Sequence, residues 1–234
     1  MHLSSNPSQT TAKSLPAEPN PYAGFPSGFF DRSDSSSDAI FYEAPRLVTH
    51  IDEGAISAVG QAYAELGVNG RVLDLMSSWI SHLQTKPAAL TVLGMNAEEL
   101  AANPMADEAV VHDLNKNPML PFDDNAFDQV MCTVSVDYLA RPIEVFSEVA
   151  RVLVPGGVFV CTFSNRCFPT KAIRGWLSLD DVGHCDLVEQ YFRRSSGWEP
   201  ARSAEVVRRG MGVDPLFAVW AHTLTSSASN SQSA

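Results

Sequence analysis

Basic residues are scarce in this sequence. Its 234 residues include 16 lysines and arginines against 27 aspartates and glutamates, which gives a formal net charge of −11. Such a charge opposes binding to phosphate backbones and to anionic membranes, because long-range repulsion would have to be overcome. We therefore expect neither nucleic acid nor a membrane as a partner.

Long apolar runs are also missing. No run approaches the roughly 20 residues that cross a bilayer, and the N-terminus lacks the basic region and apolar core of a secretion signal. These absences predict a soluble, cytoplasmic protein. An organelle is the alternative, because the opening MHLSSNPSQTTAK contains serine and threonine and no acidic residue, as transit peptides do.

The motifs of several other chemistries are absent as well. The sequence has no G-x-S-x-G, no phosphate loop ending in G-K-S or G-K-T, and no H-E-x-x-H. The cysteines form no C-x-x-C pair and no zinc-ligand spacing with the histidines, so we expect free thiols and no metal site. The four are Cys132, Cys161, Cys167 and Cys185.

Polar, aperiodic sequence at both ends sets the expected domain boundaries. Residues 1–37 carry Pro, Ser, Asn and Gly and end in DRSDSSS, and the tail reads TSSASNSQSA. Segments of this composition bury too little surface to offset the entropy lost on ordering. We expect a disordered segment over 1–37, one domain over 38–224 and a disordered tail over 225–234.

Helical and strand patterns alternate inside this domain. Apolar residues recur at helical spacing from Ile56 to Leu66, and another apolar face follows Pro142, which suits a first helical turn. The short apolar runs RVLDLM, LTVLGM, AVVHDL, FDQVMCTV and VFVCTF predict strands, and SAEVVRRG with DPLFAVWAHT predicts an antiparallel pair. Because strands that alternate with helices form parallel sheets covered on both faces, we predict an α/β, Rossmann-like three-layer sandwich. Its seven-stranded sheet would be mostly parallel, with a C-terminal antiparallel strand.

Polar residues stand at the carboxyl ends of the predicted strands, where open α/β sheets bind ligands. Residues 74–81 follow the first strand, Asn96 the second, Asp113 the third and Thr133 the fourth. Asn96 with Glu99 three residues later also predicts a helix cap.

The segment from Asp113 to Asn165 carries a more specific pattern. It contains LPFDDNAFD, a predicted strand, a helix with E-x-x-R-V-L and a PGG turn. In this order and spacing it resembles the class I S-adenosylmethionine-dependent methyltransferases, in particular the methyltransferase type 11 group of small-molecule enzymes. The resemblance covers about Arg71 to Asn165. It implies S-adenosylmethionine as cofactor and a small soluble molecule as substrate.

The resemblance also implies cofactor contacts. Asp74 would anchor the methionine end, Asn96 would stand where the family has an acidic ribose ligand, and Asp113 would accept a hydrogen bond from the adenine amino group. Neighbouring loop residues would line the same ligand. The full set is Asp74, Met76, Ser77, Ser78, Asn96, Asp113, Leu114, Thr133 and Val134.

Two positions depart from the family pattern. The first loop is usually G-x-G-x-G, since the backbone must turn tightly and the ligand must approach without a Cβ in the way; here Met76, Ser78 and Ile80 replace the glycines. Asn96 keeps an acceptor but lacks the charge that makes such hydrogen bonds about twice as strong. Trp79 either stacks on the adenosine or fills its space. Cofactor affinity is therefore either weakened or lost.

Three further residues are candidates for contact with the substrate. Arg166 and Lys171 lie in the basic stretch SNRCFPTKAIRGW, which either meets an anionic substrate or forms a solvated face. Tyr138 stands where family members often carry a histidine, and it either serves as a catalytic base or positioning hydroxyl, or packs in the core.

Two functions remain open. The preferred one is transfer of a methyl group from S-adenosylmethionine to a small soluble acceptor, with the protein aligning the reactants and excluding water. The alternative is a catalytically inactive module of the same fold that binds or scaffolds a partner, its first loop packed shut by Met76 and Trp79. An open crevice between Met76, Asn96 and Asp113 favours the enzyme, and a filled one favours the module.

Overall fold

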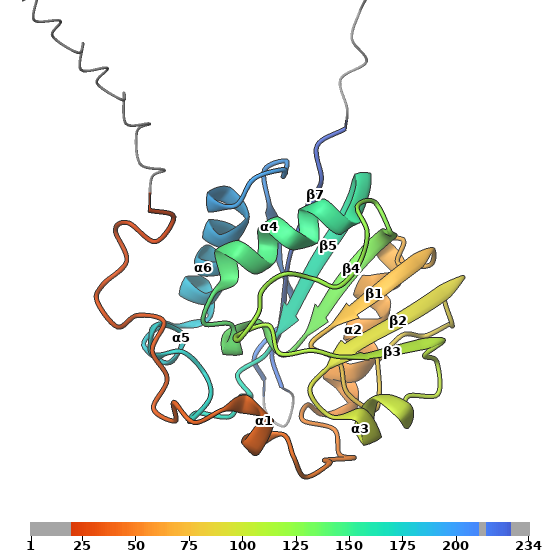
Figure 1. Cartoon of the computed structure of the whole chain (residues 1–234), viewed down its shortest axis with the longest axis horizontal. Coiled ribbons are helices and arrows are strands. Elements are labelled where there is room, and N and C mark those ends of the chain that lie inside the picture. Colours follow the sequence, from red (N-terminus) through yellow and green to blue (C-terminus); the bar gives the residue numbers. More distant parts are fainter. Residues whose placement is uncertain (1–19, 211–213, 226–234) are drawn as a thin grey trace, which may run out of the picture.

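The computed structural model describes residues 20–210 and 214–225, and a seven-stranded sheet forms their centre (Figure 1). The strands are β1 Arg71–Leu75, β2 Ala89–Gly94, β3 Glu108–Val111, β4 Phe127–Thr133, β5 Leu153–Phe163, β6 Arg202–Val207 and β7 Leu216–His222. Their order across the sheet is β3-β2-β1-β4-β5-β7-β6. β1 to β5 pair in parallel, whereas β7 is antiparallel to both β5 and β6. The predicted fold class is confirmed.

Helices cover both faces of the sheet. They are α1 Asp38–Phe41, α2 Glu53–Glu65, α3 Ala97–Ala101, α4 Pro142–Val152, α5 Arg174–Leu177 and α6 Asp181–Arg194, with a 3-10 turn, η1, at Val136–Tyr138. One apolar core joins α4 and α6 to the sheet through residues such as Phe146 and Tyr191. A second core joins α2 to the other face through Val59 and Tyr63. The result is the three-layer arrangement expected from the sequence.

Local signals set the helix ends as the sequence predicts. Pro142 is the first residue of α4, and Gly67 takes a φ of +71° just after α2, a conformation that favours glycine. The Asn96 side chain accepts hydrogen bonds from the backbone N–H groups of Glu98 and Glu99 and so caps α3. The helix cap predicted at Asn96 is confirmed.

The connection from β1 to β2 has an unusual form. Parallel neighbours are usually joined by a crossover helix, but residues 76–88 contain none. The backbone N–H of Ser77 instead donates to the carbonyl of Leu93 at 2.8 Å. Gly94 allows this close approach, because a Cβ there would clash with the carbonyl oxygen of Ser77. The first loop is thereby held against the end of β2.

The segment before α1 lies against the domain, with its aromatic rings clustered beside α6. Tyr22, Phe25, Phe29 and Phe30 pack on the core of α4 and α6, and the Arg194 guanidinium carbon lies 4.5 Å from the centre of the Phe25 ring. Residues 20–37 therefore differ from the disordered segment predicted over 1–37, because these aromatics bury surface that composition alone did not reveal. Residues 1–19 and 226–234 lie outside the described part of the chain.

Figure 1 shows this segment passing α5 and reaching α1 near the carboxyl ends of the strands. Within residues 20–210 and 214–225, no helix has the length and apolar character needed to cross a membrane.

Candidate functional site

A cavity of about 280 Å³ lies at the carboxyl ends of β1 to β4. The structure brings all nine predicted cofactor residues to its wall, together with Tyr138 and Arg166. The crevice between Met76, Asn96 and Asp113 is open. The nine are Asp74, Met76, Ser77, Ser78, Asn96, Asp113, Leu114, Thr133 and Val134.

Asp74 places a buried carboxyl group at the end of β1. Its Oδ2 accepts a hydrogen bond from the Ser77 hydroxyl at 2.7 Å. Burial raises the pKa of Asp74 to about 7, although hydrogen bonds from Ser81 and Ser77 act in the opposite direction. Near neutral pH this group is therefore divided between its charged and neutral forms, and a nearby cation would favour the charged one.

The glycine-free loop forms part of the cavity wall. Met76 takes a left-handed φ of +59°, a conformation costly for a side-chain-bearing residue. The Trp79 indole N–H donates to the carbonyl of Val48 at 3.1 Å. The Ser78 hydroxyl donates to Glu99 at 2.6 Å. Met76 and Trp79 thus both line the cavity without closing it.

Asn96 is saturated with internal hydrogen bonds. Its Oδ1 accepts from the two N–H groups of α3, and its Nδ2 donates to the carbonyls of Tyr42 at 2.9 Å and Glu43 at 3.1 Å. This differs from the open ribose acceptor that the family resemblance implies. The structure uses Asn96 to hold the segment after α1.

Glu99 is a buried carboxylate on the cavity wall that sequence reasoning assigned only to capping. Its Oε1 accepts from the backbone N–H of Arg46 at 2.6 Å, and its Oε2 accepts from Ser78. Glu99 thereby joins the first loop, α3 and the segment after α1. An acidic residue one turn into a helix that follows a strand end was the available signal.

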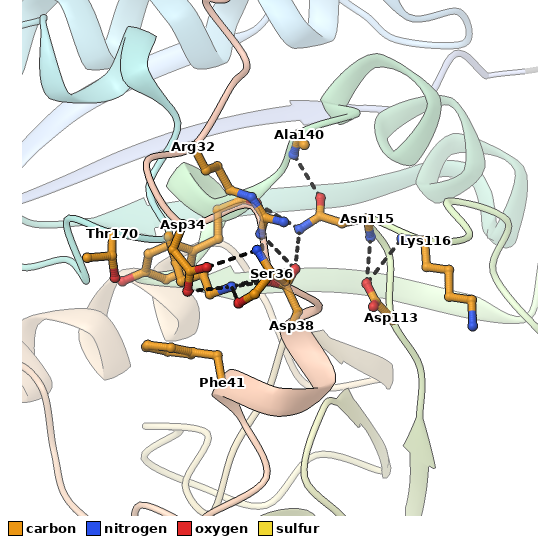
Figure 2. A network of polar contacts seen from close by, with 12 residues as sticks. Arg32, Asp34, Ser36, Asp38, Phe41, Asp113, Asn115, Lys116, Ala140 and Thr170 are labelled. Atoms are coloured by element: carbon orange, nitrogen blue, oxygen red, sulfur yellow. Dashed lines mark hydrogen bonds and ion pairs between the residues drawn. The ribbon is translucent and has the colours of Figure 1, made fainter.

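Asp113 caps the turn after β3 with one carboxylate oxygen. Its Oδ1 accepts from the backbone N–H groups of Asn115 at 3.0 Å and Lys116 at 3.1 Å. Figure 2 shows that the Asn115 amide then reaches Asp38, to which it donates at 2.9 Å. Among the described residues no group donates to Oδ2 of Asp113, so this oxygen is available to a ligand.

Thr133 and Val134 lie where β4 ends. The Thr133 hydroxyl shares a hydrogen bond of 2.6 Å with the Tyr63 hydroxyl, and Tyr63 also contacts Thr162. Val134 has a left-handed φ of +44°, and its N–H donates to the Thr162 carbonyl at 2.7 Å. The backbone turn at this point exposes both residues to the cavity.

Tyr138 is buried beside Phe168, whose backbone N–H donates to the Tyr138 hydroxyl oxygen at 2.8 Å. Burial raises the pKa of Tyr138 well above its ordinary value. A phenol of this kind stays protonated at neutral pH, which opposes a role as catalytic base. The geometry suits the other predicted role, in which the hydroxyl proton positions a bound molecule.

Lys171 does not line the cavity. It is fully buried, and its Nζ lies 3.0 Å from Asp34 and 3.2 Å from Asp38. Arg32 contacts both oxygens of Asp38 at 2.7 Å (Figure 2). The position of Lys171 therefore differs from the predicted contact with substrate, because two carboxylates of the N-terminal segment engage its charge.

Arg166 reaches the cavity but also forms an ion pair, with its Nε 2.8 Å from Asp214. Its side chain is 61% exposed. Around it lies a part of the cavity, which we call the second half, of which the sequence predicted only Tyr138 and Arg166. The second half is lined by Asp38, Tyr42, Arg46, His50, Tyr138, Arg166, Cys167 and Phe168.

Known proteins share this domain. Residues 64–161 match a family model described as a methyltransferase domain. A malonyl-(acyl-carrier protein) O-methyltransferase from a Marinomonas species is 26% identical over 87 residues, which are 37% of this chain and 31% of that protein. The chain thus matches less than a third of the length of this curated relative.

Solved structures share the fold at low identity. The cyclase SpnF has a TM-score of 0.55 at 15% identity, over 77% of this chain and 89% of that chain. An S-adenosylmethionine-dependent methyltransferase from Mesorhizobium loti has a TM-score of 0.50 at 16% identity, over 70% of this chain and 97% of that chain. The solved structures show the fold that this chain shares with them, and the match over residues 64–161 together with the strand order supports a class I S-adenosylmethionine-dependent methyltransferase family, here with a glycine-free first loop.

Proposed function

We propose that this protein transfers a methyl group from S-adenosylmethionine to a small soluble acceptor in the cytoplasm. The observation that carries the proposal is that all nine residues selected as cofactor contacts from the sequence lie on the wall of one open cavity. They are spread over residues 74–134 and lie at four strand ends, so only the fold brings them together.

The charges of the wall fit a cationic cofactor. Three carboxyl groups, those of Asp74, Glu99 and Asp113, line the part of the cavity next to the ends of β1, β2 and β3, which we call the cofactor half. A sulfonium cation is favoured by nearby carboxylates in a partly dry site. Asp113 can accept a hydrogen bond at Oδ2, while Asn96 offers no further donor or acceptor.

In the proposed reaction the protein mainly orients and shields its ligands. S-adenosylmethionine, when bound, supplies an activated methyl group. Asp113 and the backbone of Leu114 would hold the adenine, Asp74 would balance the positive charge, and the Tyr138 hydroxyl would orient the acceptor. The segment of residues 42–50 covers one side of the cavity and would exclude water.

The comparisons support the reaction class more than the acceptor. The name of the Marinomonas relative describes methylation at an oxygen of a malonyl group on a carrier protein, and from it we carry over only O-methylation. The SpnF likeness shows that this fold also belongs to a protein named as a cyclase.

Calorimetric titration with S-adenosylhomocysteine tests the proposal. We expect binding in the micromolar range and about tenfold weaker binding by Asp113→Asn, because the new amide donors would face the adenine amino group. Oδ1 of the variant still caps Asn115 and Lys116, so its thermal stability should match the wild type. Unchanged affinity in a folded Asp113→Asn variant would remove this residue from the site.

A second function, a non-catalytic binding module, is favoured by one observation: the Asn96 amide is fully used by Tyr42, Glu43 and α3. In this case the segment after α1 takes the hydrogen bonds of Asn96 that the ribose would otherwise form. Absence of heat and of a thermal shift at millimolar S-adenosylhomocysteine would support the module and overturn the enzyme.

A further inference from the structure

The charged side chains of the cavity wall are unevenly distributed. Asp74, Glu99 and Asp113 line the cofactor half, whereas two arginines, Arg46 and Arg166, line the second half together with one carboxyl group, that of Asp38. The protein as a whole has a formal net charge of −11. Two cations on one wall of an acidic protein therefore single out this half for a negatively charged molecule.

Arg46 has unused hydrogen-bonding capacity. Its Nη2 donates to the carbonyl of Phe41 at 2.8 Å, but its Nη1 is buried and finds no acceptor among the described residues. A buried N–H without a partner is destabilising, and more so when it belongs to a charged group. A carboxylate bound in the second half would supply the acceptor that Nη1 lacks.

Aromatic rings surround the Arg46 guanidinium. Its central carbon lies 4.6 Å from the ring centre of Phe41 and 5.7 Å from that of Phe168. Phe168 in turn stacks on Tyr138 with 5.9 Å between ring centres, and His50 meets Phe168 edge-on at 5.1 Å. Such walls favour a flat, apolar body next to the charged group.

The acidic groups near the second half do not cancel these cations. Arg32 and Lys171 neutralise Asp38, as Figure 2 shows for the contacts of Asp38 with Arg32. Glu99 binds the backbone N–H of Arg46, and its other oxygen holds Ser78, so no hydrogen bond joins it to the guanidinium. Asp214 pairs with Arg166 through Nε alone. The Arg46 charge therefore remains available to a ligand.

We infer that the second half binds the carboxylate of a small acid with a flat, unsaturated or aromatic body, and that Arg46 determines this specificity. The inference rests on the proposed function, in which this acid is the methyl acceptor. Of the two cations selected from the sequence, Arg166 lines the second half, whereas Lys171 is replaced in this role by a residue from the segment after α1.

The test compares acids with their uncharged amides. Ligand-observed NMR would measure binding of benzoate, phenylacetate and cinnamate, each against its amide, to the full chain with and without saturating S-adenosylhomocysteine. We expect at least one acid to bind about tenfold more tightly than its amide. Arg46→Gln should abolish this preference and leave amide binding unchanged, and Arg46→Lys should retain part of it.

The control variant is Arg202→Gln. It removes an exposed arginine at the start of β6, the edge strand on the side of the sheet away from β1 to β3. It should keep the acid preference. Thermal unfolding shows whether the Arg46→Gln variant is folded. If it does not fold, the Arg46→Lys variant provides the test.

The outcomes are distinguishable. No acid preference in the wild type, or a preference that survives both Arg46 substitutions, overturns the inference. Absence of S-adenosylhomocysteine binding overturns the proposed methyl transfer, whereas an Arg46-dependent acid preference in the same sample would still support a carboxylate site.

Discussion

The Asn96 side chain donates a hydrogen bond of 2.9 Å to the backbone carbonyl of Tyr42, and this contact fastens the segment after α1 to the end of β2. The side chain that was expected to accept hydrogen bonds from ribose hydroxyls is thus already hydrogen-bonded to the protein's own backbone. Ligand binding and attachment of this segment both involve Asn96, which makes the residue the most informative position for mutation.

Asn96→Asp should lower stability by about 1 to 3 kcal/mol. Aspartate still caps α3, but it cannot donate to Tyr42 and Glu43, so two carbonyls lose their partner. Urea denaturation measures the loss, and Asn96→Ala, which also removes the cap, should lose about 1 kcal/mol more. Wild-type stability in the aspartate variant would contradict the observed hydrogen bonds.

Met76→Gly should raise the affinity for S-adenosylhomocysteine several-fold. Met76 has a φ of +59° on the cavity wall, and glycine removes both the backbone strain and the Cβ that a ligand would meet. The matched control is Met119→Gly, since Met119 is 63% exposed and does not line the cavity. Calorimetry compares the two, and equal affinities would show that the first loop does not limit binding.

Asp74 should make stability depend on pH. Because its folded-state pKa of about 7 lies above the ordinary value of 3.8, the native state binds more protons between these values, and stability falls as pH rises from about 4 to about 7. The slope from this group is at most about 1.4 kcal/mol per pH unit.

Asp74→Asn should flatten that slope in urea denaturation followed across this range. Part of the slope should remain, because burial also raises the pKa of Asp137, to about 8. If the variant has the same pH profile as the wild type, the pKa of Asp74 in the folded protein is not raised above its ordinary value.

Lys171→Met should destabilise the protein by about 3 kcal/mol, because the loss of a buried cation leaves Asp34 and Asp38 without one partner. The exposed pair of Lys86 and Asp107 is the control, and Lys86→Met should cost under about 1 kcal/mol. Hydrogen exchange should show loss of protection in residues 31–42 in the first variant only. Equal effects of the two substitutions would argue against a structural role for Lys171.

Much of the fold could be predicted because its signals are local. The apolar period from Ile56 to Leu66, Pro142 at a helix start and Asn96 at a strand end each act within a few residues. The cofactor half could also be located, since parallel strands bring their carboxyl ends to one edge. These parts of the prediction needed no knowledge of distant contacts.

Apart from Tyr138 and Arg166, the second half of the cavity could not be predicted in the same way. Arg46 reaches it through a hydrogen bond to Glu99, 53 residues away, and Asp38 meets Asn115, 77 residues away. Nothing in the local sequence around Arg46 marks it as a cavity residue. Lys171 was expected in the site because its ion-pair partners are also far away in the sequence. Asp34 and Asp38 hold it in the interior.

The sequence by itself determined the alternation of strands and helices, the polar strand ends and the absence of glycine from the first loop, because these depend on periodicity and residue type. Only the tertiary structure decided which hydrogen bonds Asn96 makes and which cation faces the cavity. Those choices depend on where the segment of residues 20–50 docks, and docking is the sum of contacts among residues that are far apart in the chain.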